Sequence, residues 1–214
     1  MHALITGATR GIGAALATEL AQSSTTLTLN ARSARAGFEA LDVTDPASAR
    51  ALAERLQGKP IGLLVCNAGV YLDKGHALET GYAADLWAAT FAANVTGVFL
   101  TIQALLPNLR AAKGKIAIIS SQMASQMNAP GGSYIYRTSK AAALNIGRNL
   151  AVDLKPDGIA VGIYHPGWVQ TDMGGTAAQI TPAESAKGLA QRFAALSLET
   201  TGCFETWDGR AHPL

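Results

Sequence analysis

The feature that most constrains this chain is a regular alternation of short apolar runs, typical of β-strands, with alanine-rich segments of helical length. The strand-like runs lie at residues 2–6, 25–30, 38–41, 61–66, 115–120, 159–164 and 203–206. Strands that alternate with helices predict a parallel sheet with helices on both faces. We therefore expect an α/β fold with a doubly wound parallel sheet, a single domain over 1–214.

The expected helices begin at recognisable signals. Asp45-Pro46 and Thr181-Pro182-Ala183-Glu184 each offer an N-cap followed by proline at the first helical position, and the second also reads as a capping box. A long helix is expected over about 133–154. Only seven residues separate the strand runs 25–30 and 38–41, too few for a helical crossover, so we expect a loop there.

Composition excludes several function classes. The 17 Lys and Arg against 15 Asp and Glu give a net charge of +2 without charge runs, so no basic surface for nucleic acid is expected. No uninterrupted apolar stretch approaches the ~20 residues of a membrane helix, and the first residues lack a signal-peptide pattern. The 2 cysteines are too few for a disulfide framework, and Cys66 lies in an apolar run that is expected to be buried. We expect a cytoplasmic protein without a nucleic-acid, membrane or metal partner.

A glycine-rich turn, Thr6-Gly7-Ala8-Thr9-Arg10-Gly11-Ile12-Gly13, follows the first strand and opens a helix. Glycines allow close approach of backbone to a ligand, and free N–H groups at a helix start suit a pyrophosphate. The spacing differs from G-x-G-x-x-G, and alone it also fits a plain tight turn. The context favours a Rossmann-type dinucleotide-binding and catalytic domain.

The end of the second strand, Asn30-Ala31-Arg32-Ser33, lacks the carboxylate that holds an adenosine 2′-hydroxyl. Arg32 and Arg10 offer bidentate partners for a 2′-phosphate instead. This favours NADP(H) over NAD(H), with two solvated surface arginines as the alternative. Asp42-Val43 follows the third strand, and its carboxylate either reaches the adenine amino group or caps a turn.

Tyr136-Arg137-Thr138-Ser139-Lys140 places a phenol and an ammonium on one helix face, because residues i and i+4 are neighbours there. A nearby cation lowers a tyrosine pKa, and moving it from about 10 to about 7 takes about 4 kcal/mol. The pair is therefore able to exchange a proton with an alcohol or ketone. Alone, this spacing is explained more often by an ordinary amphipathic helix than by catalysis, and Tyr134 is expected to be structural.

Further motifs lie at the ends of strands. Asn94 lies inside the long segment Asp85–Leu109, where an isolated asparagine, taken by itself, is expected to be an interior polar residue. Taken in order, TGATRGIG, NAG, Asn94, Ser121, YRTSK and HPGWVQT resemble the short-chain dehydrogenase/reductase family over nearly the whole chain. The short second crossover, HPGWVQTDMGG and the ending Gly202-Cys203-Phe204 with Asp208-Gly209 are similar to its compact C-factor and sniffer type of carbonyl reductase.

The resemblance implies residue roles. Tyr136 is the general acid/base, Lys140 lowers its pKa and holds the nicotinamide ribose, Ser121 binds the substrate oxygen, and Asn94 anchors a water. The implied cofactor-binding residues are Gly7, Arg10, Gly11, Ile12, Gly13, Asn30, Arg32, Asp42, Val43, Asn67, Ala68, Gly69, Tyr136, Lys140, Pro166, Gly167, Val169 and Thr171.

Two departures from the family pattern matter. The spacing from Ser121 to Tyr136 is longer than the usual one. Ser120 and Ser125 therefore remain lesser candidates for the serine whose hydroxyl binds the substrate oxygen. After Thr171 only a short segment precedes the next helix, which predicts a small lid and a weakly selective site.

The expected function is an NADP(H)-dependent oxidoreductase that transfers hydride between nicotinamide and a small carbonyl or secondary alcohol. The resemblance also implies a homo-oligomer paired through helices 85–109 and 133–154. An alternative is a cofactor-bound signalling or regulatory protein with incidental turnover, which a Tyr136→Phe variant would distinguish. Epimerase and dehydratase relatives share the Tyr and Lys spacing, but their larger substrate domains do not fit in 214 residues.

Overall fold

Seven parallel strands form one sheet in the computed structural model, which describes residues 1–23 and 25–214. The strand order is β3-β2-β1-β4-β5-β6-β7, the arrangement of a doubly wound fold. The strands are β1 His2–Ile5, β2 Thr26–Ala31, β3 Glu39–Ala40, β4 Leu63–Cys66, β5 Lys115–Ile119, β6 Ala160–His165 and β7 Phe204–Thr206. The fold class and the strand runs expected from the sequence are confirmed.

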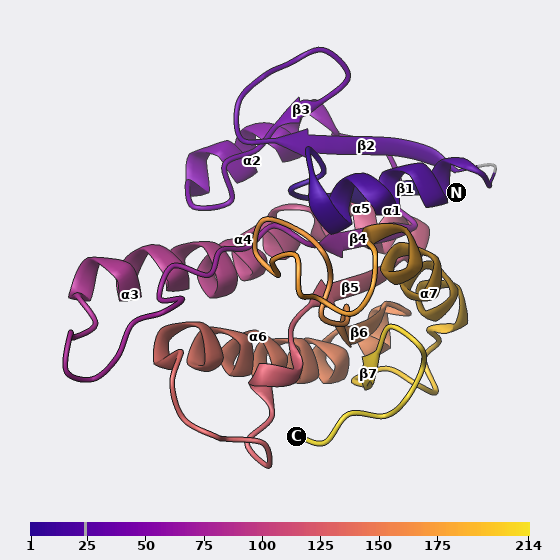
Figure 1. Cartoon of the computed structure of the whole chain (residues 1–214). Helices are drawn as coiled ribbons and strands as arrows, with labels where there is room; N and C mark the ends of the chain where they lie inside the picture. The colour runs from indigo at the N-terminus through magenta and orange to yellow at the C-terminus, as the bar shows by residue number, and fades with distance from the viewer. Residues whose placement is uncertain (24) are drawn as a thin grey trace.

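Helices cover both faces of this sheet (Figure 1). On one face α1 (Gly11–Ala21) packs against α7 (Pro182–Ala195). The other face carries α2 (Pro46–Arg55), α4 (Gly97–Ala104), α5 (Leu106–Ala112) and α6 (Tyr134–Asp153), with α3 (Ala84–Phe91) preceding α4. Alternate strand residues feed the two cores: Ala3 and Ile5 face α1 and α7, and Leu4 faces α2, α4 and α5.

The helix signals act as the sequence predicts. The Asp45 carboxylate accepts the Ala47 N–H at 2.8 Å, and Thr181 forms the full capping box with Glu184 at the start of α7. Between β2 and β3 the chain forms a loop without a helix. Short polar caps therefore set the start of each of these two helices, as N-cap chemistry requires.

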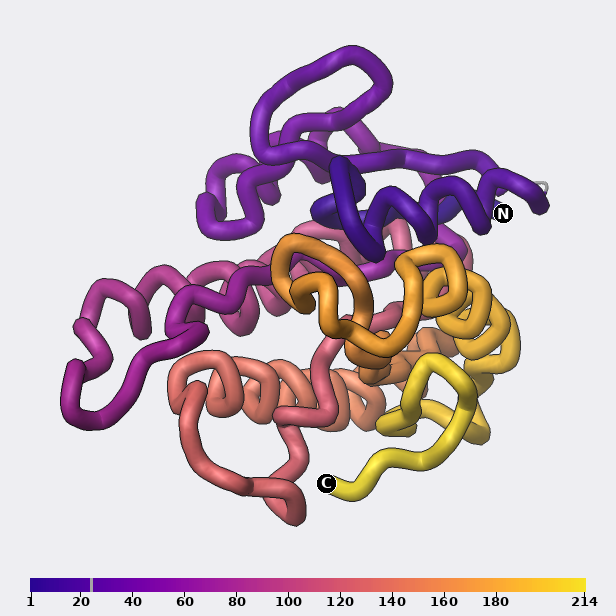
Figure 2. The backbone as a smooth tube through the Cα atoms, in the orientation of Figure 1, coloured from indigo at the N-terminus to yellow at the C-terminus, as the bar shows by residue number. Residues whose placement is uncertain are grey.

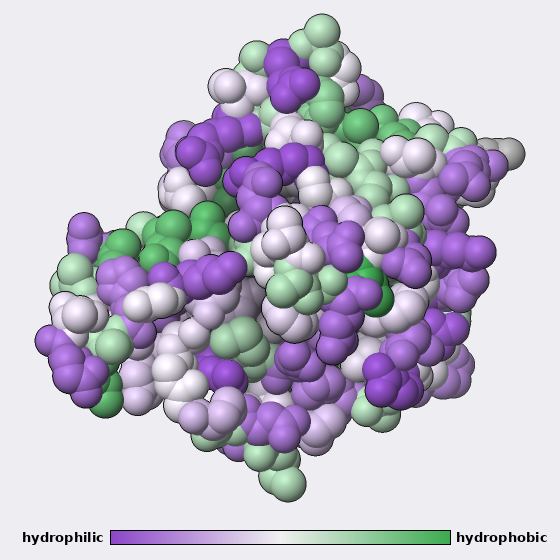
Figure 3. Space-filling model, viewed as in Figure 1, coloured by the Kyte–Doolittle hydropathy of each residue, from purple (hydrophilic) through white to green (hydrophobic). Residues whose placement is uncertain are grey.

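The long segment 85–109 is not one uniform helix. A π-helical turn over Ala92–Thr96 joins α3 to α4. The run Ala84–Ala104 has 21 residues and a mean hydropathy of 1.3 in its most apolar window, so it reaches the length and composition of a membrane helix, contrary to the expectation from the sequence. A single such helix is weak support for a membrane span, because core helices of soluble folds pass the same test; 39% of this window is buried in the fold. Apolar residues on its outer side are visible over α3 and α4 in Figure 3.

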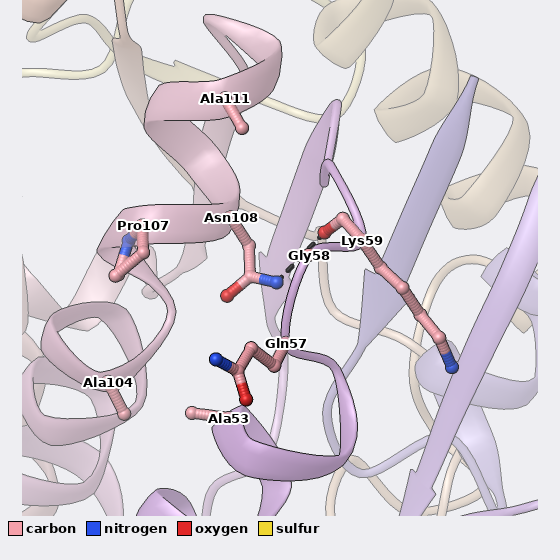
Figure 4. A pocket seen from close by; sticks show the side chains of 8 residues that line it. All are labelled: Ala53, Gln57, Gly58, Lys59, Ala104, Pro107, Asn108 and Ala111. Carbon is pink, nitrogen blue, oxygen red and sulfur yellow. Dashed lines mark hydrogen bonds between the residues drawn. The ribbon is translucent and has the colours of Figure 1, made fainter.

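A hollow of about 320 Å³ lies between the end of α2 and α5 (Figure 4). Asn108 on α5 reaches across beside it: its Nδ2 donates to the carbonyl oxygens of Leu56 at 2.7 Å and Lys59 at 2.8 Å. These bonds hold the turn after α2 against the helical layer.

Candidate active site

The predicted site residues gather at the edge of the sheet where the strands end at their carboxyl termini. Figure 2 shows the loop after β6, in orange, lying beside the start of α1. This is the edge at which open α/β sheets bind ligands. The loops at this edge carry Gly7 and Arg10 after β1, Asp42 and Val43 after β3, Asn67, Ala68 and Gly69 after β4, and Pro166, Gly167, Val169 and Thr171 after β6. Gly11, Ile12 and Gly13 open α1, and Tyr136 and Lys140 lie on α6. Asn30 is the next-to-last residue of β2, and Arg32 follows that strand.

The glycine turn leaves no room for a side chain at Gly7 or Gly13. Gly7 has a φ of 63°, and a Cβ on Gly13 would lie 2.3 Å from the Gly7 oxygen and 2.6 Å from Asn67 Nδ2. That same Nδ2 donates to the carbonyl oxygens of Thr6 at 3.0 Å and Gly7 at 3.1 Å. Asn67 therefore holds the turn in shape, and the bare backbone forms a cradle that fits a pyrophosphate.

The adenosine end of the proposed cofactor site contains an unused acceptor. Asn30 is buried, and its Oδ1 has no hydrogen-bond partner in the described part of the chain. Asp42 Oδ1 accepts from both the backbone N–H and the hydroxyl of Thr44, which lowers the carboxyl pKa, and the positive charge of Arg32 lowers it further. One carboxylate oxygen of Asp42 therefore caps a turn, as one of the two alternatives for this residue expects. The Arg32 guanidinium lies close enough to the same carboxylate for its charge to lower the pKa.

Arg10 is paired within the protein. Its Nη1 lies 2.5 Å from Asp172 Oδ2, and both side chains are 79% exposed. The sequence identified Arg10 as a candidate to bind a 2′-phosphate and did not indicate that Asp172 would pair with it. Since exposed ion pairs contribute about 0–1 kcal/mol, this contact is easily exchanged.

The loop after β6 lies against the glycine turn. A Cβ on Gly11 would lie 3.3 Å from Thr171 Cγ2, so these two segments are in near contact. The Thr171 hydroxyl bonds inside its own loop, donating to the Val169 oxygen at 3.3 Å and accepting from the Gly174 N–H at 3.1 Å. Gly167, at a φ of 88°, leaves the strand edge with a backbone that only glycine adopts readily.

Ser121 and Tyr136 meet in the buried part of the site. Ser121 is the N-cap of a short 3₁₀ turn, and its Oγ accepts the Met123 N–H at 3.1 Å. Burial raises the pKa of Tyr136 to about 12, the hydrogen bond with Ser121 lowers it in part, and Tyr71 raises it further. The expected shift toward 7 is therefore wrong for this structure, because the desolvation of the phenolate outweighs its stabilisation.

Lys140 shares the buried face of α6 with Tyr136. Its Nζ lies 5.7 Å from the centroid of the Tyr136 ring and donates to the Ile119 oxygen at 2.9 Å. Burial lowers the pKa of Lys140 to about 8. A Cβ on Gly69 would lie 3.5 Å from this Nζ and 3.0 Å from Asn94 Oδ1, which places the Asn-Ala-Gly loop directly against both groups.

Asn94 lies in the π-helical turn and is fully hydrogen-bonded. Its Nδ2 donates to the Val70 oxygen at 2.9 Å and to Ser139 Oγ at 3.0 Å, and its Oδ1 accepts the Val70 N–H at 2.8 Å. The side chain thus joins the loop after β4 to α6, as the interior reading of Asn94 predicts. Single π turns often occur at functional sites.

The two lesser serine candidates bond elsewhere. Ser120 Oγ donates to the Lys140 oxygen at 3.0 Å, and Ser125 Oγ donates to the Leu214 oxygen at 3.2 Å. Ser121 is therefore the serine whose hydroxyl faces Tyr136.

Two residues of the loop after β4, Tyr71 and Asp73, contact Tyr136 or its helix, and the sequence did not identify either of them as part of the site. Tyr71 stacks on Tyr136 with ring centroids 4.2 Å apart and planes inclined by 21°. Asp73 is fully buried and accepts the backbone N–H of both Ile135 and Tyr136. An aspartate in a polar loop carries no sequence signal for burial, so only the tertiary structure identifies it.

Comparison with known proteins assigns the family. The sequence profile of the short chain dehydrogenase family matches residues 1–180. The C-signal protein of Myxococcus xanthus is 38% identical over 166 residues, which cover 77% of this chain and 99% of that protein. Among solved structures, NADPH-bound carbonyl reductase from chicken fatty liver has a TM-score of 0.89 at 29% identity, covering 100% of this chain and 98% of that one. Carbonyl reductase Sniffer of D. melanogaster has a TM-score of 0.93 at 26% identity, covering 100% and 99%. The chain therefore belongs to the short-chain dehydrogenase family of oxidoreductases, in which it resembles the compact carbonyl reductases.

Proposed function

We propose that this protein is an NADP(H)-dependent oxidoreductase that transfers hydride between nicotinamide and a carbonyl or secondary alcohol. The observation that carries the proposal is the contact between the buried Ser121 and Tyr136 side chains, with Lys140 on the same helix face. We take the substrate to be a small uncharged carbonyl compound and the location to be the cytoplasm.

The residues present fit a dinucleotide. The glycine cradle would take the pyrophosphate, and the free Asn30 Oδ1 would accept a donor from the adenosine half. Arg32, together with Arg10 once it leaves Asp172, would bind a 2′-phosphate. When bound, the reduced nicotinamide supplies the hydride for reduction. The NADPH-bound chicken carbonyl reductase, a structural relative, supports this cofactor.

The chain's own groups polarise the substrate and supply the proton. Ser121 Oγ and Tyr136 Oη would donate hydrogen bonds to the carbonyl oxygen, which fixes its position and stabilises the negative charge that develops there. Tyr136 Oη then gives its proton to the forming alcohol. The Lys140 ammonium favours the phenolate left behind, and Asn94 holds Lys140's helix against the loop after β4.

Tyr136→Phe tests the acid directly. The variant keeps the ring but loses the transferable proton, so NADPH should bind as in the wild type while carbonyl reduction, followed by NADPH absorbance over a panel of aldehydes and ketones, is abolished. Retention of more than about a tenth of kcat, a loss under ~1.4 kcal/mol, would mean that the acid lies elsewhere. Ser121→Ala should also lose activity, and Ser125→Ala, whose hydroxyl bonds to Leu214, is the matched control.

The cofactor assignment has its own test. Each charge-assisted contact to a 2′-phosphate contributes ~1.5–3 kcal/mol, so Arg32→Ala should raise the NADPH Kd roughly 10- to 100-fold with little change for NADH. Arg10→Ala should have a smaller effect, because Arg10 must first leave Asp172. A wild-type protein that binds NADH as tightly as NADPH would refute the assignment and favour a ribose 2′-hydroxyl bonded to Asn30.

A second candidate function is a cofactor-bound signalling protein, which the similarity to C-signal favours. The two readings predict different behaviour of Tyr136→Phe in a strain that lacks the gene. If Tyr136→Phe lacks turnover and fails to restore the phenotype, the protein acts as an enzyme. If it lacks turnover but restores the phenotype, the protein has a signalling role.

A further inference from the structure

The first turn of α6 is capped from outside the helix. Ser133, the residue before the helix, lies in the left-handed region with a φ of 48° and a ψ of 42°, and its side chain caps no helix N–H. The first four N–H groups of any helix lack partners inside it. In α6 these groups belong to the turn that carries Tyr136, so its position depends on how they are satisfied.

Asp73 supplies the missing acceptors. Its Oδ2 accepts the Ile135 N–H at 2.9 Å and its Oδ1 accepts the Tyr136 N–H at 3.2 Å. The side chain is 0% exposed and comes from the loop after β4, 62 residues earlier in the chain than Ile135. A carboxylate is well suited to this place, because the positive end of the helix dipole favours an anion.

Tyr71 reinforces the same turn. Its hydroxyl hydrogen-bonds Ser133 Oγ, and its ring stacks on the Tyr136 ring. Tyr71 and Asp73 form what we call the α6 clamp: one holds the ring and the residue before the helix, and the other holds the backbone beneath the ring. The clamp residues follow Gly69 and Val70 directly in the loop after β4; Val70 hydrogen-bonds Asn94, and Gly69 lies beside Asn94 and Lys140.

The geometry points to Asp73 as a positioning residue for Tyr136: its carboxylate fixes the first turn of α6 and so holds the phenol at hydrogen-bonding distance from Ser121 and the substrate oxygen. This inference rests on the proposed role of Tyr136 as the proton donor. Without an acceptor, two buried N–H groups would be left unpaired, and the turn would fray toward water to satisfy them. Since misplacement of a reacting group by about 1 Å can cost a factor of about 100 in rate, fraying should appear in kcat.

Two substitutions separate this role from plain stability. Asp73→Ala removes both acceptors, and we expect kcat to fall at least tenfold while the KM for the carbonyl substrate and the NADPH Kd stay within about twofold. Asp73→Asn keeps the size and one acceptor oxygen for two donors, so it should restore much of the loss yet remain at least threefold below wild type. Amide hydrogen exchange at Ile135 and Tyr136 should speed up in the same order.

Asp45→Ala is the matched control, because the Asp45 carboxylate also caps the start of a helix, α2, and its hydrogen bond comes from the Ala47 N–H and from no proposed site residue. It should lower Tm and leave kcat unchanged. A folded Asp73→Ala protein with wild-type kcat overturns the inference, and if that variant cannot be purified, wild-type kcat and exchange in Asp73→Asn overturn it instead. A Tyr136→Phe protein that still turns over refutes the proposed function itself, whereas an inactive Tyr136→Phe beside a fully active Asp73→Ala refutes the positioning role alone.

Discussion

Replacing Lys140 with methionine should make the stability of the protein, relative to wild type, fall as the pH rises from 7 to 10. Lys140 is 6% exposed, and burial lowers its pKa from 10.5 to about 8. Methionine has a similar length without the charge. The substitution therefore removes a buried ammonium and also one hydrogen bond, the one from Nζ to the Ile119 oxygen.

The magnitude follows from the two pKa values. Between pH 8 and 10.5 the unfolded chain binds more protons at Lys140 than the folded one, so wild-type stability rises with pH through this window. Below pH 8 the buried charge costs the folded state about 3 kcal/mol, at about 1.4 kcal/mol for each pH unit between the two values. An unpaired Ile119 oxygen costs the variant about 1–3 kcal/mol. At pH 7 the variant should thus equal the wild type or exceed it by up to about 2 kcal/mol.

Urea unfolding of both proteins at pH 7, 8, 9 and 10, followed by tryptophan fluorescence, measures the difference in the free energy of unfolding. Groups other than Lys140 titrate alike in both proteins, so the difference isolates this residue. Wild type should gain about 2 to 3 kcal/mol on the variant between pH 7 and 10. Lys187→Met, at an exposed position, controls for the lost positive charge. A difference that stays constant over this range would contradict a lowered pKa of Lys140 in the folded protein.

Three further outcomes are expected. Asp172→Asn frees Arg10 from its exposed ion pair and should lower the NADPH Kd two- to fivefold without changing that for NADH, as measured by fluorescence titration. Gly13→Ala places a Cβ 2.3 Å from the Gly7 oxygen and should reduce cofactor affinity at least tenfold and stability by about 1–3 kcal/mol, as measured by titration and urea unfolding. Asn108→Ala removes two hydrogen bonds and leaves the Lys59 oxygen unpaired, while the Leu56 oxygen keeps the Lys59 N–H, so it should lower the free energy of unfolding by about 2 kcal/mol in urea, with kcat unchanged because the residue lies at the hollow between α2 and α5.

Local signals explain why most of the fold could be predicted. Each strand lies within two residues of an apolar run, and the caps at Asp45 and Thr181 begin α2 and α7 where the sequence places them. The loop between β2 and β3 follows from chain length alone. These features depend on residues adjacent in sequence, so pattern and propensity suffice to identify them.

The missed features all depend on contacts between distant segments. The direction of the Tyr136 pKa depends on how deeply the phenol is buried, which the i and i+4 spacing does not report. Asp73 and the Arg10 partner Asp172 are polar residues in loops, where polar residues are common, and only the fold brings them to α6 and the glycine turn. The apolar length of Ala84–Ala104 was also missed, because polar residues such as Thr90, Asn94 and Thr101 interrupt the apolar run.

The π-helical turn at Ala92–Thr96 also restricts how the length of this chain can vary. Each residue of an α-helix advances the helix by about 100°, so losing one residue in the turn would rotate α3 and α4 relative to each other by that angle. Either Asn94 would leave Val70 and Ser139, or Val98 and Ile102 would leave the core. The loop between β2 and β3, in contrast, can gain or lose residues at its exposed tip. The fold should therefore not tolerate single-residue insertions or deletions at Asn94, although that segment is apolar and regular. It should tolerate them near Gly37, where the chain is irregular.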